Sequence, residues 1–155
     1  MSSLRNTIRT LILETQEPIY GFIDTLATSA TSANLGYNNE ITLDHGECIT
    51  LLSIELDEEA GDYAWVNNLY TTNKRGQPDP GCYRKGYASE MMSLLTRAAD
   101  QHGVTLELIA APPARMKRND PSLPDKDELA SFYGRYGFEE TDRNSMQVYM
   151  TRYPQ

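Results

Sequence analysis

The chain has 155 residues, a length that suits a single domain, here residues 1–155, with one sizeable hydrophobic core. Its formal net charge of −8 argues against non-specific attraction to nucleic acid or to an anionic membrane and favours an amine-bearing partner, because the field of the whole molecule repels polyanions. No apolar run reaches the roughly 18 residues of a membrane span and no signal core begins the chain, so we expect a cytoplasmic protein.

Two stretches near the start, residues 4–14 and 18–30, carry apolar residues at helical spacing and predict two helices. Pro18 suits the first turn of the second helix, and Thr15 could cap it. The Thr-Leu-Ile-Leu run within the first stretch could equally form a strand. The small residues at 28–33 predict a loop.

A β-rich stretch follows, in which runs of Ile, Leu, Thr and Tyr alternate with turn residues. The runs are residues 40–43, 48–56 and 63–72, and the turns between them are residues 44–46 and 60–62. This pattern predicts an antiparallel meander of three strands. Residues 73–82 contain glycines and prolines that cannot continue a strand, so we expect a long loop there.

A helix is predicted at residues 87–102, because its apolar residues form one stripe and Gly103 follows where helices commonly end. Residues 104–111 alternate apolar and polar side chains up to Pro112 and predict a buried strand, parallel to the strand before the helix. Strand, loop, helix and strand together form a right-handed crossover.

The last part of the chain predicts a second helix and two closing strands. After a Pro-rich connection at 114–124, Asp125 and Glu128 form a capping-box pattern that begins the helix, and Gly137 ends it. Its apolar face carries Leu129, Phe132, Tyr133 and Tyr136. Residues 138–141 and 146–151 are the two strands. The predicted fold class is α+β, with a mixed central sheet flanked by helices.

The segment Arg84-Lys85-Gly86-Tyr87-Ala88 lies where a helix begins, and suits an anion. The unpaired N–H groups of a first turn, here Tyr87, Ala88 and Ser89, and the helix dipole attract negative charge. Gly86 permits close approach of a phosphate, and Arg84 and Lys85 add positive charge. Taken alone, the segment could equally be an ordinary helix start with solvated basic residues, because short glycine motifs are weak.

Over roughly residues 48–153, the order and content of these segments resemble the GNAT superfamily of N-acetyltransferases. The family's Gln/Arg-x-x-Gly-x-Gly/Ala loop corresponds to residues 83–88, where Gly86 and Ala88 match and Tyr83 takes the Gln/Arg place. Its A-x-x-F-Y-x-x-x-G-F segment corresponds to residues 129–138. The helix-to-strand join at residues 101–108 also looks like the corresponding join in small GNAT members encoded by phages or bacteria.

The resemblance implies a GNAT fold and a site for acetyl-CoA. The backbone of residues 83–88 would hold the pyrophosphate, and Arg84 or Lys85 would supply the contact that Tyr83 cannot. The strand around 68–71 would part from its neighbour and direct N–H groups of Leu69 and Tyr70 toward the thioester carbonyl. Tyr133 aligns with the family's general acid, whereas periodicity alone favours a core aromatic at this position.

The general base stays unassigned, because Trp65 occupies the strand position where some relatives carry glutamate. Glu55, or a water held by Asn67 or Asn68, could serve. We expect structural roles for His45, in a turn, and His102, at a helix end. Neither histidine has metal-ligand spacing to a cysteine, so we expect no metal and reduced thiols at Cys48 and Cys82.

Two charged clusters lie outside these motifs. The acidic run Glu55, Asp57, Glu58, Glu59 and Asp62 could attract a cationic acceptor, although a solvated hairpin explains it as well. The basic residues Arg115, Lys117 and Arg118 could contact a cofactor phosphate or project into water.

The function that follows is transfer of an acetyl group from acetyl-CoA to a primary amine in a ternary complex. The alternative is a catalytically silent acyl-CoA-binding or protein-binding module with the same fold. The expected partner is an amine-bearing protein or small molecule, not nucleic acid or a membrane, and the chain could form a homodimer. The acceptor itself is not legible in the sequence.

Overall fold

The computed structural model describes residues 17–36, 38–112 and 123–155. The predicted helix at 4–14, the cap residue Thr15 and the basic residues Arg115, Lys117 and Arg118 lie outside this part of the chain.

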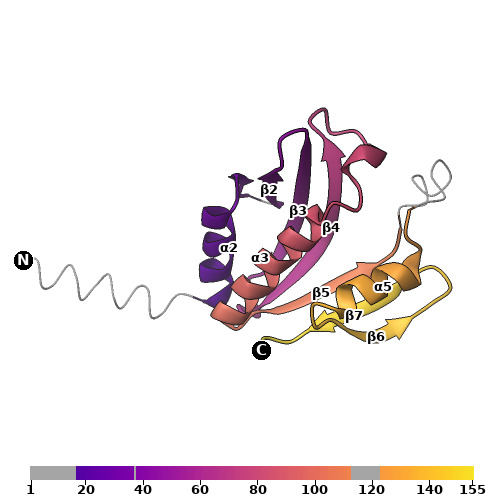
Figure 1. The fold of residues 1–155 in the computed structure, drawn as a ribbon. Helices are drawn as coiled ribbons and strands as arrows, with labels where there is room; N and C mark the ends of the chain where they lie inside the picture. The colour runs from indigo at the N-terminus through magenta and orange to yellow at the C-terminus, as the bar shows by residue number, and fades with distance from the viewer. Residues whose placement is uncertain (1–16, 37, 113–122) are drawn as a thin grey trace, which may run out of the picture.

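The centre of the fold is a seven-stranded mixed sheet in the order β1-β2-β3-β4-β5-β7-β6 (Figure 1). Its strands are β1 Ser32–Asn34, β2 Asn39–Asp44, β3 Cys48–Asp57, β4 Tyr63–Asn73, β5 Thr105–Ala110, β6 Glu139–Arg143 and β7 Val148–Arg152. Strands β4 and β5 pair in parallel, and the other neighbours pair antiparallel. The predicted meander, the parallel strand and the closing strand pair are confirmed, and so is the predicted fold class.

Two helices, α2 Pro18–Ser29 and α3 Tyr87–His102, lie side by side on one face of the sheet (Figure 1). They approach closely because Gly21 leaves room for the His102 ring, whose Nε2 is 2.7 Å from Thr25 Oγ1. The bounds of α3 agree with the prediction, and Gly103 follows in the left-handed conformation. A third helix, α5 Lys126–Gly134, packs on β5 and β7, with the Asp125 carboxylate accepting the Glu128 N–H at its N-terminus.

The core lies between these helices and the sheet. The face of β3 below the helices carries Thr50, Leu52 and Ile54, all fully buried, and Leu95 of α3 packs in the same core. The opposite face carries partly exposed side chains, among them Trp65, Tyr70 and Ile109. A mixed sheet whose pairs are mostly antiparallel can present one face to solvent in this way.

Three local predictions were wrong. The helix predicted at 18–30 is confirmed as α2, but β1 follows it at Ser32, where we expected a loop; all three residues of β1 are exposed, so it has no alternating pattern. The cap residue of α2 is Glu17 rather than Thr15. Helix α5 ends at Gly134, and a turn leads from there to Gly137.

The prediction of reduced thiols was also wrong, because Cys48 and Cys82 form a disulfide. They are 34 positions apart, so no spacing motif indicates the bond. The β3–β4 hairpin brings them together: Cys48 begins β3, its register partner Asn73 ends β4, and Cys82 ends the short helix η1 Pro80–Cys82 in the loop that follows. Their Cα atoms lie 5.7 Å apart.

Candidate active site

Strands β4 and β5 part from each other halfway along β4. Only Tyr63–Val66 of β4 pair with β5, opposite Thr105–Leu108, although β4 continues to Asn73. Figure 1 shows the two strands diverging beyond this point, with β5 turning toward β7. The predicted separation of the strand around 68–71 from its neighbour is therefore present. Beyond Val66, the backbone groups on that edge of β4 have no strand partner among residues 17–36, 38–112 and 123–155.

A β-bulge at Asn67 marks the start of the separation. Val66 pairs with Ile54 and Asn68 pairs with Ser53, so Asn67 has no partner on β3. The extra residue shifts the alternation, so that Leu69 and Thr71 continue the face of Ala64 and Val66. Leu69 is half-buried against the core, and Tyr70 projects from the opposite face. Leu69 and Tyr70 are the predicted contacts of the thioester. Because of the bulge, their backbone groups point in different directions from those in the half of β4 that pairs with β5.

Helix α3 packs against β3 and β4, and its N-terminus follows the loop that leaves the end of β4 (Figure 1). Gly86 is its N-cap, with φ 80° and no side-chain cap, and the first helical bond runs from Glu90 N–H to Gly86 C=O. The first-turn N–H groups of Tyr87, Ala88 and Ser89 therefore have no partner within the helix. A Cβ at Gly86 would meet nothing within 4 Å, so the approach to these groups is open.

Two basic residues, Arg84 and Lys85, precede this helix start, and both are exposed. Arg84 has φ 58°, a left-handed conformation that non-glycine residues seldom adopt. A helix N-terminus with open amides and adjacent positive charge suits a phosphate group. The segment is at a helix start, as the sequence predicts, and its use as a pyrophosphate site stays a prediction.

His45, in the β2–β3 turn, stacks on Tyr87 at the same helix start, with ring centroids 3.9 Å apart and planes inclined by 11°. Its Nε2 is 2.9 Å from Thr50 Oγ1, and its Nδ1 is 3.6 Å from the Glu90 carboxylate. We expected only a structural role in a turn for His45. Its contact with residue 87 is long-range, and no local sequence signal indicates it.

Tyr133, the predicted general acid, lies on α5, which packs on β5 and β7. Its ring lies in the core, 9% exposed, with edge-to-face contacts to Phe132 and Phe138. Burial raises the pKa of the phenol to about 12. The hydroxyl makes no hydrogen bond to another described residue.

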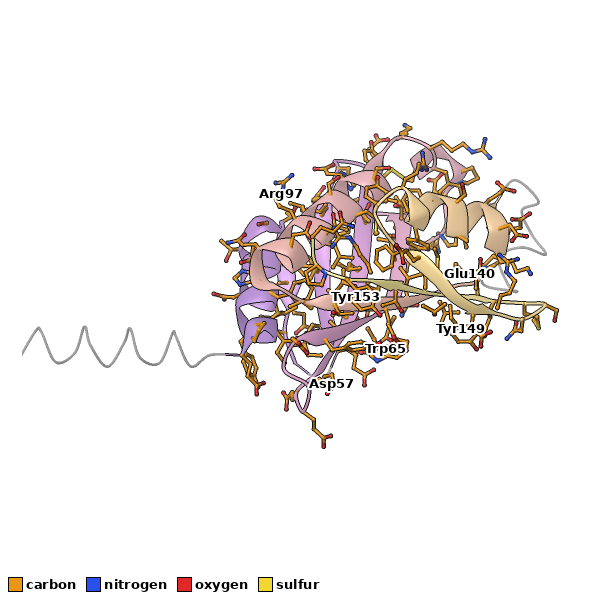
Figure 2. All side chains as sticks on the ribbon, turned by 90° about the horizontal axis from the view of Figure 1, so that it is seen from below. Asp57, Trp65, Arg97, Glu140, Tyr149 and Tyr153 are labelled. Carbon is orange, nitrogen blue, oxygen red and sulfur yellow. A yellow bond between two sulfur atoms is a disulfide. The ribbon has the colours of Figure 1, made fainter. Side chains whose placement is uncertain are left out.

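An acidic pocket of about 570 Å³ is lined in part by Trp65 and Asp57, two side chains that Figure 2 labels. Four carboxylates, of Glu55, Asp57, Glu58 and Glu59, and two aromatic rings, of Tyr20 and Trp65, contribute to its lining. Trp65 pairs with Glu55 on β3 and immediately precedes Val66, the last residue of β4 to pair with β5. The pocket therefore adjoins the part of β4 where the pairing with β5 ends.

The predicted site residues come from three elements. Leu69 and Tyr70 lie on β4, residues 84–89 lie at the N-terminus of α3, and Tyr133 lies on α5. Their roles stay predictions. Among residues 17–36, 38–112 and 123–155, no three His, Cys, Asp or Glu side chains are grouped to hold a metal ion. No helix in this part of the chain is long and apolar enough to span a membrane.

Comparisons with known proteins find likeness in structure alone. No protein-family model matches the chain, and no curated protein matches it. The similar solved structures include an acyl-CoA N-acyltransferase from Pseudomonas aeruginosa (12% identity, 86% of this chain and 89% of that chain, TM-score 0.46). Another is the anti-CRISPR protein AcrVA5 (19% identity, 71% and 96%, TM-score 0.45), and a third is a protein from Pyrococcus horikoshii OT3 (12% identity, 86% and 73%, TM-score 0.43). At such low identities and TM-scores, these likenesses do not bear on the activity of this chain.

Proposed function

We propose that this chain is an acyl-CoA-dependent acyltransferase of the GNAT type, and more specifically that it transfers an acetyl group from acetyl-CoA to a primary amine. The observation that carries the proposal is the parting of β4 from β5 at Val66, together with the start of α3 at Gly86, whose first-turn N–H groups have no partner within the helix. This arrangement suits a long ligand with an amide-rich arm and a pyrophosphate. The edge of β4 without a strand partner can pair with the arm, and the start of α3 can bind the pyrophosphate.

The residues present fit such a ligand. Its pyrophosphate would be held by the N–H groups of Tyr87, Ala88 and Ser89, which Gly86 leaves accessible, with Lys85 adding a charged contact. The free edge of β4 at Leu69 and Tyr70 offers backbone groups to the arm and to the carbonyl oxygen where charge develops during transfer. Acetyl-CoA would supply the activated acetyl group.

Tyr133 would donate the proton that the departing thiolate needs. With a pKa of about 12 the phenol is fully protonated at neutral pH. Full proton transfer to a thiolate whose thiol has a pKa of about 8.5 would be uphill by about 5 kcal/mol, so the proton must move as the bond to sulfur breaks. Tyr133 would therefore act in the transition state.

The acidic pocket beside Trp65 supports an amine as acceptor. Its four carboxylates favour a cation, and the faces of Tyr20 and Trp65 can add cation–π contacts. An amine must lose its proton before it attacks the thioester. Glu55, which accepts a hydrogen bond from Asn67 Nδ2 at 3.4 Å, is the carboxylate nearest the bulge in sequence register, but the general base stays unassigned.

A second candidate is an acyl-CoA-binding module without catalytic activity. The observation that favours it is Trp65, which occupies the β4 position where a glutamate would serve as base. Such a module would keep the helix start at Gly86 and the free edge of β4.

Two measurements separate these functions. Acetyl-CoA should raise the melting temperature of the chain in both cases, because a ligand that binds only the folded state stabilises it. Only an enzyme should release free CoA when acetyl-CoA is incubated with a panel of polyamines, aminosugars and lysine peptides. If millimolar acetyl-CoA leaves the melting temperature unchanged, both functions are wrong.

A further inference from the structure

The β2–β3 turn, residues 44–48, lies against the cofactor loop, residues 82–89. Two contacts join them: the Cys48–Cys82 disulfide, and the stack of His45 on Tyr87. The cofactor loop contains all the residues proposed to hold the pyrophosphate. The turn contributes none of them, so its contacts with the loop have a different use.

The covalent contact is placed just before the phosphate site. Cys82 is the last residue of η1, four positions ahead of the Gly86 cap, and Cys48 is the first residue of β3. Both cysteines are buried, with 4% and 5% of their surface exposed. The bond therefore attaches the start of the cofactor loop to the interior of the sheet.

The second contact fixes the other end of the loop. The His45 side chain is 6% exposed, and its ring is held by Thr50 on one edge and faces Glu90 on the other. The His45 N–H donates to Cys48 C=O, which couples the two contacts within one turn. Tyr87, the partner of the stack, is the first residue of α3.

The loop between β4 and α3 needs such support. It carries two left-handed residues, Arg84 and Gly86, within three positions. A non-glycine residue in this conformation persists only where the surrounding structure maintains it. The left-handed turn also directs the first amides of α3 outward, so the conformation of the loop decides whether the phosphate site exists.

We propose that the β2–β3 turn is a clamp that holds the cofactor loop in its phosphate-binding conformation, and that reduction of the Cys48–Cys82 disulfide opens the clamp and lowers affinity for acyl-CoA. This inference rests on the proposed function. A dithiol supplies the two electrons: one of its thiolates attacks a cysteine sulfur, the Cys48–Cys82 bond breaks, and the second thiol closes a cyclic disulfide, which leaves two protein thiols. Disulfides in reducing compartments are commonly transient or redox-sensing.

The test compares oxidised and dithiothreitol-reduced protein, with desulfo-CoA as the ligand because it lacks the thiol and cannot exchange with the disulfide. If reduction leaves about a tenth of the molecules with a competent loop, apparent affinity falls about tenfold. Titration is done where circular dichroism shows both forms folded. The double variant Cys48→Ser/Cys82→Ser should bind like the reduced protein, with or without dithiothreitol.

Amide hydrogen exchange gives a readout that does not depend on the ligand. Reduction should speed exchange in residues 83–89, and leave β5 and β7 protected. The noncovalent contact is tested in the oxidised protein: His45→Ala should weaken desulfo-CoA binding, and His45→Phe, which keeps an aromatic ring against Tyr87, should restore part of it. His102→Ala, which removes a ring from the α2–α3 contact, is the matched control and should leave affinity unchanged.

Each outcome decides between the two claims. Equal affinity of the oxidised and reduced forms, with unchanged exchange in residues 83–89, would overturn the clamp while leaving the proposed function intact. Absent binding by the oxidised protein would contradict the proposed function and the acyl-CoA part of this inference. Even in that case, faster amide exchange in residues 83–89 on reduction would support the claim that the disulfide holds the loop in its conformation.

Discussion

At the scale of single residues, Tyr133 shows how one environment supports both packing and chemistry. Its ring fills the core between Phe132 and Phe138, as a structural aromatic would. The same burial keeps the phenol protonated by raising its pKa to about 12. Packing and proton donation therefore do not exclude each other, and they separate only when the hydroxyl alone is removed.

We predict that Tyr133→Phe folds normally and binds acetyl-CoA like the parent, because the aromatic volume is kept and the hydroxyl has no hydrogen-bond partner among the described residues. Turnover should fall by about 10²–10⁴ if the phenol is the general acid. The loss should shrink with an acyl donor whose thiol is more acidic, since that leaving group needs less protonation. Nearly unchanged turnover, in an assay limited by chemistry, would assign Tyr133 to packing alone.

Gly86 is the residue on which the proposed phosphate site most depends. We predict that Gly86→Trp abolishes acetyl-CoA binding, because the side chain would fill the open space in front of the α3 amides. Gly76→Trp is the matched control: Gly76 has a similar φ of 75° and equally open surroundings, so it carries the same backbone strain. Lys85→Ala should weaken binding by only about 1.5–3 kcal/mol, the worth of one charged hydrogen bond. Calorimetric titration measures the affinity of the three variants for acetyl-CoA. If Gly86→Trp binds acetyl-CoA as tightly as Gly76→Trp, the phosphate site does not lie at Gly86.

At the scale of elements, the contact between α2 and α3 depends on a missing side chain. A Cβ at Gly21 would lie 2.5 Å from Nδ1 of His102, whose ring is held by Thr25. Glycine within a helix is normally worse than alanine by about 1 kcal/mol, which would make Gly21→Ala stabilising. Here the clash outweighs that gain.

We predict that Gly21→Ala destabilises the parent by about 1–3 kcal/mol, the usual cost of overpacking. In a His102→Ala background, which frees the space, the same change should be neutral or stabilising. Urea denaturation of the four proteins measures this coupling. A destabilisation that is equal in both backgrounds would mean that the ring is not what Gly21 accommodates.

The elements that could be predicted from the sequence are those that carry a local signal. The stripe of α3 and the glycine after it gave the correct bounds, and Asp125 correctly indicated the start of α5. Strand β1 was missed because all three of its residues are exposed, so it has no hydrophobic alternation. The disulfide and the His45–Tyr87 stack were missed because both join segments far apart in the sequence, and neither has a spacing motif.

The candidate site divides in the same way. Residues 84–89 could be placed at a helix start from glycine and basic residues alone, and the structure puts them there. The bulge at Asn67 could not be read from the sequence, because it arises from the register between β3 and β4. Roles for Leu69, Tyr70 and Tyr133 came from the resemblance, and they stay predictions until binding and turnover are measured.

At the scale of the whole molecule, an ion pair joins α3 to the C-terminal strand β7. Arg152 of β7, which is 3% exposed, forms a two-point contact with Asp100 of α3, at 2.7 and 2.9 Å. Its Nε donates to Tyr136 C=O after α5, and Asp100 also accepts the Gln155 N–H. The helix that begins at the proposed phosphate site is thus tied to the elements that position Tyr133.

Removing one partner of this pair should be strongly destabilising. We predict that Asp100→Ala lowers the free energy of unfolding by about 3–5 kcal/mol, because it leaves a buried guanidinium without its counter-charge. The double variant Asp100→Leu/Arg152→Met, which replaces both charges by apolar groups, should recover much of the loss. Urea denaturation distinguishes the two. A small effect of Asp100→Ala would show that Tyr136 and solvent satisfy Arg152 without the carboxylate.

The same pair should give the chain part of its sensitivity to acid. Hydrogen bonding from Arg152 lowers the pKa of the Asp100 carboxyl below its ordinary value of 3.8. A group whose pKa is depressed by folding contributes stability that is present above its ordinary pKa and is lost as the pH falls through the folded value. We therefore predict that the difference in unfolding free energy between the parent and Asp100→Asn is constant at neutral pH and shrinks below about pH 4. Denaturation curves from neutral to acid pH measure this difference, with Glu107→Gln as the comparison. Burial raises the pKa of the Glu107 carboxyl, so the parent gains stability when this group is protonated as the pH falls. The Glu107→Gln variant lacks the group and should gain less stability than the parent on acidification. Parallel acid profiles for the parent and Asp100→Asn would mean that the carboxylate in the ion pair is no easier to ionise in the folded chain than in the unfolded one.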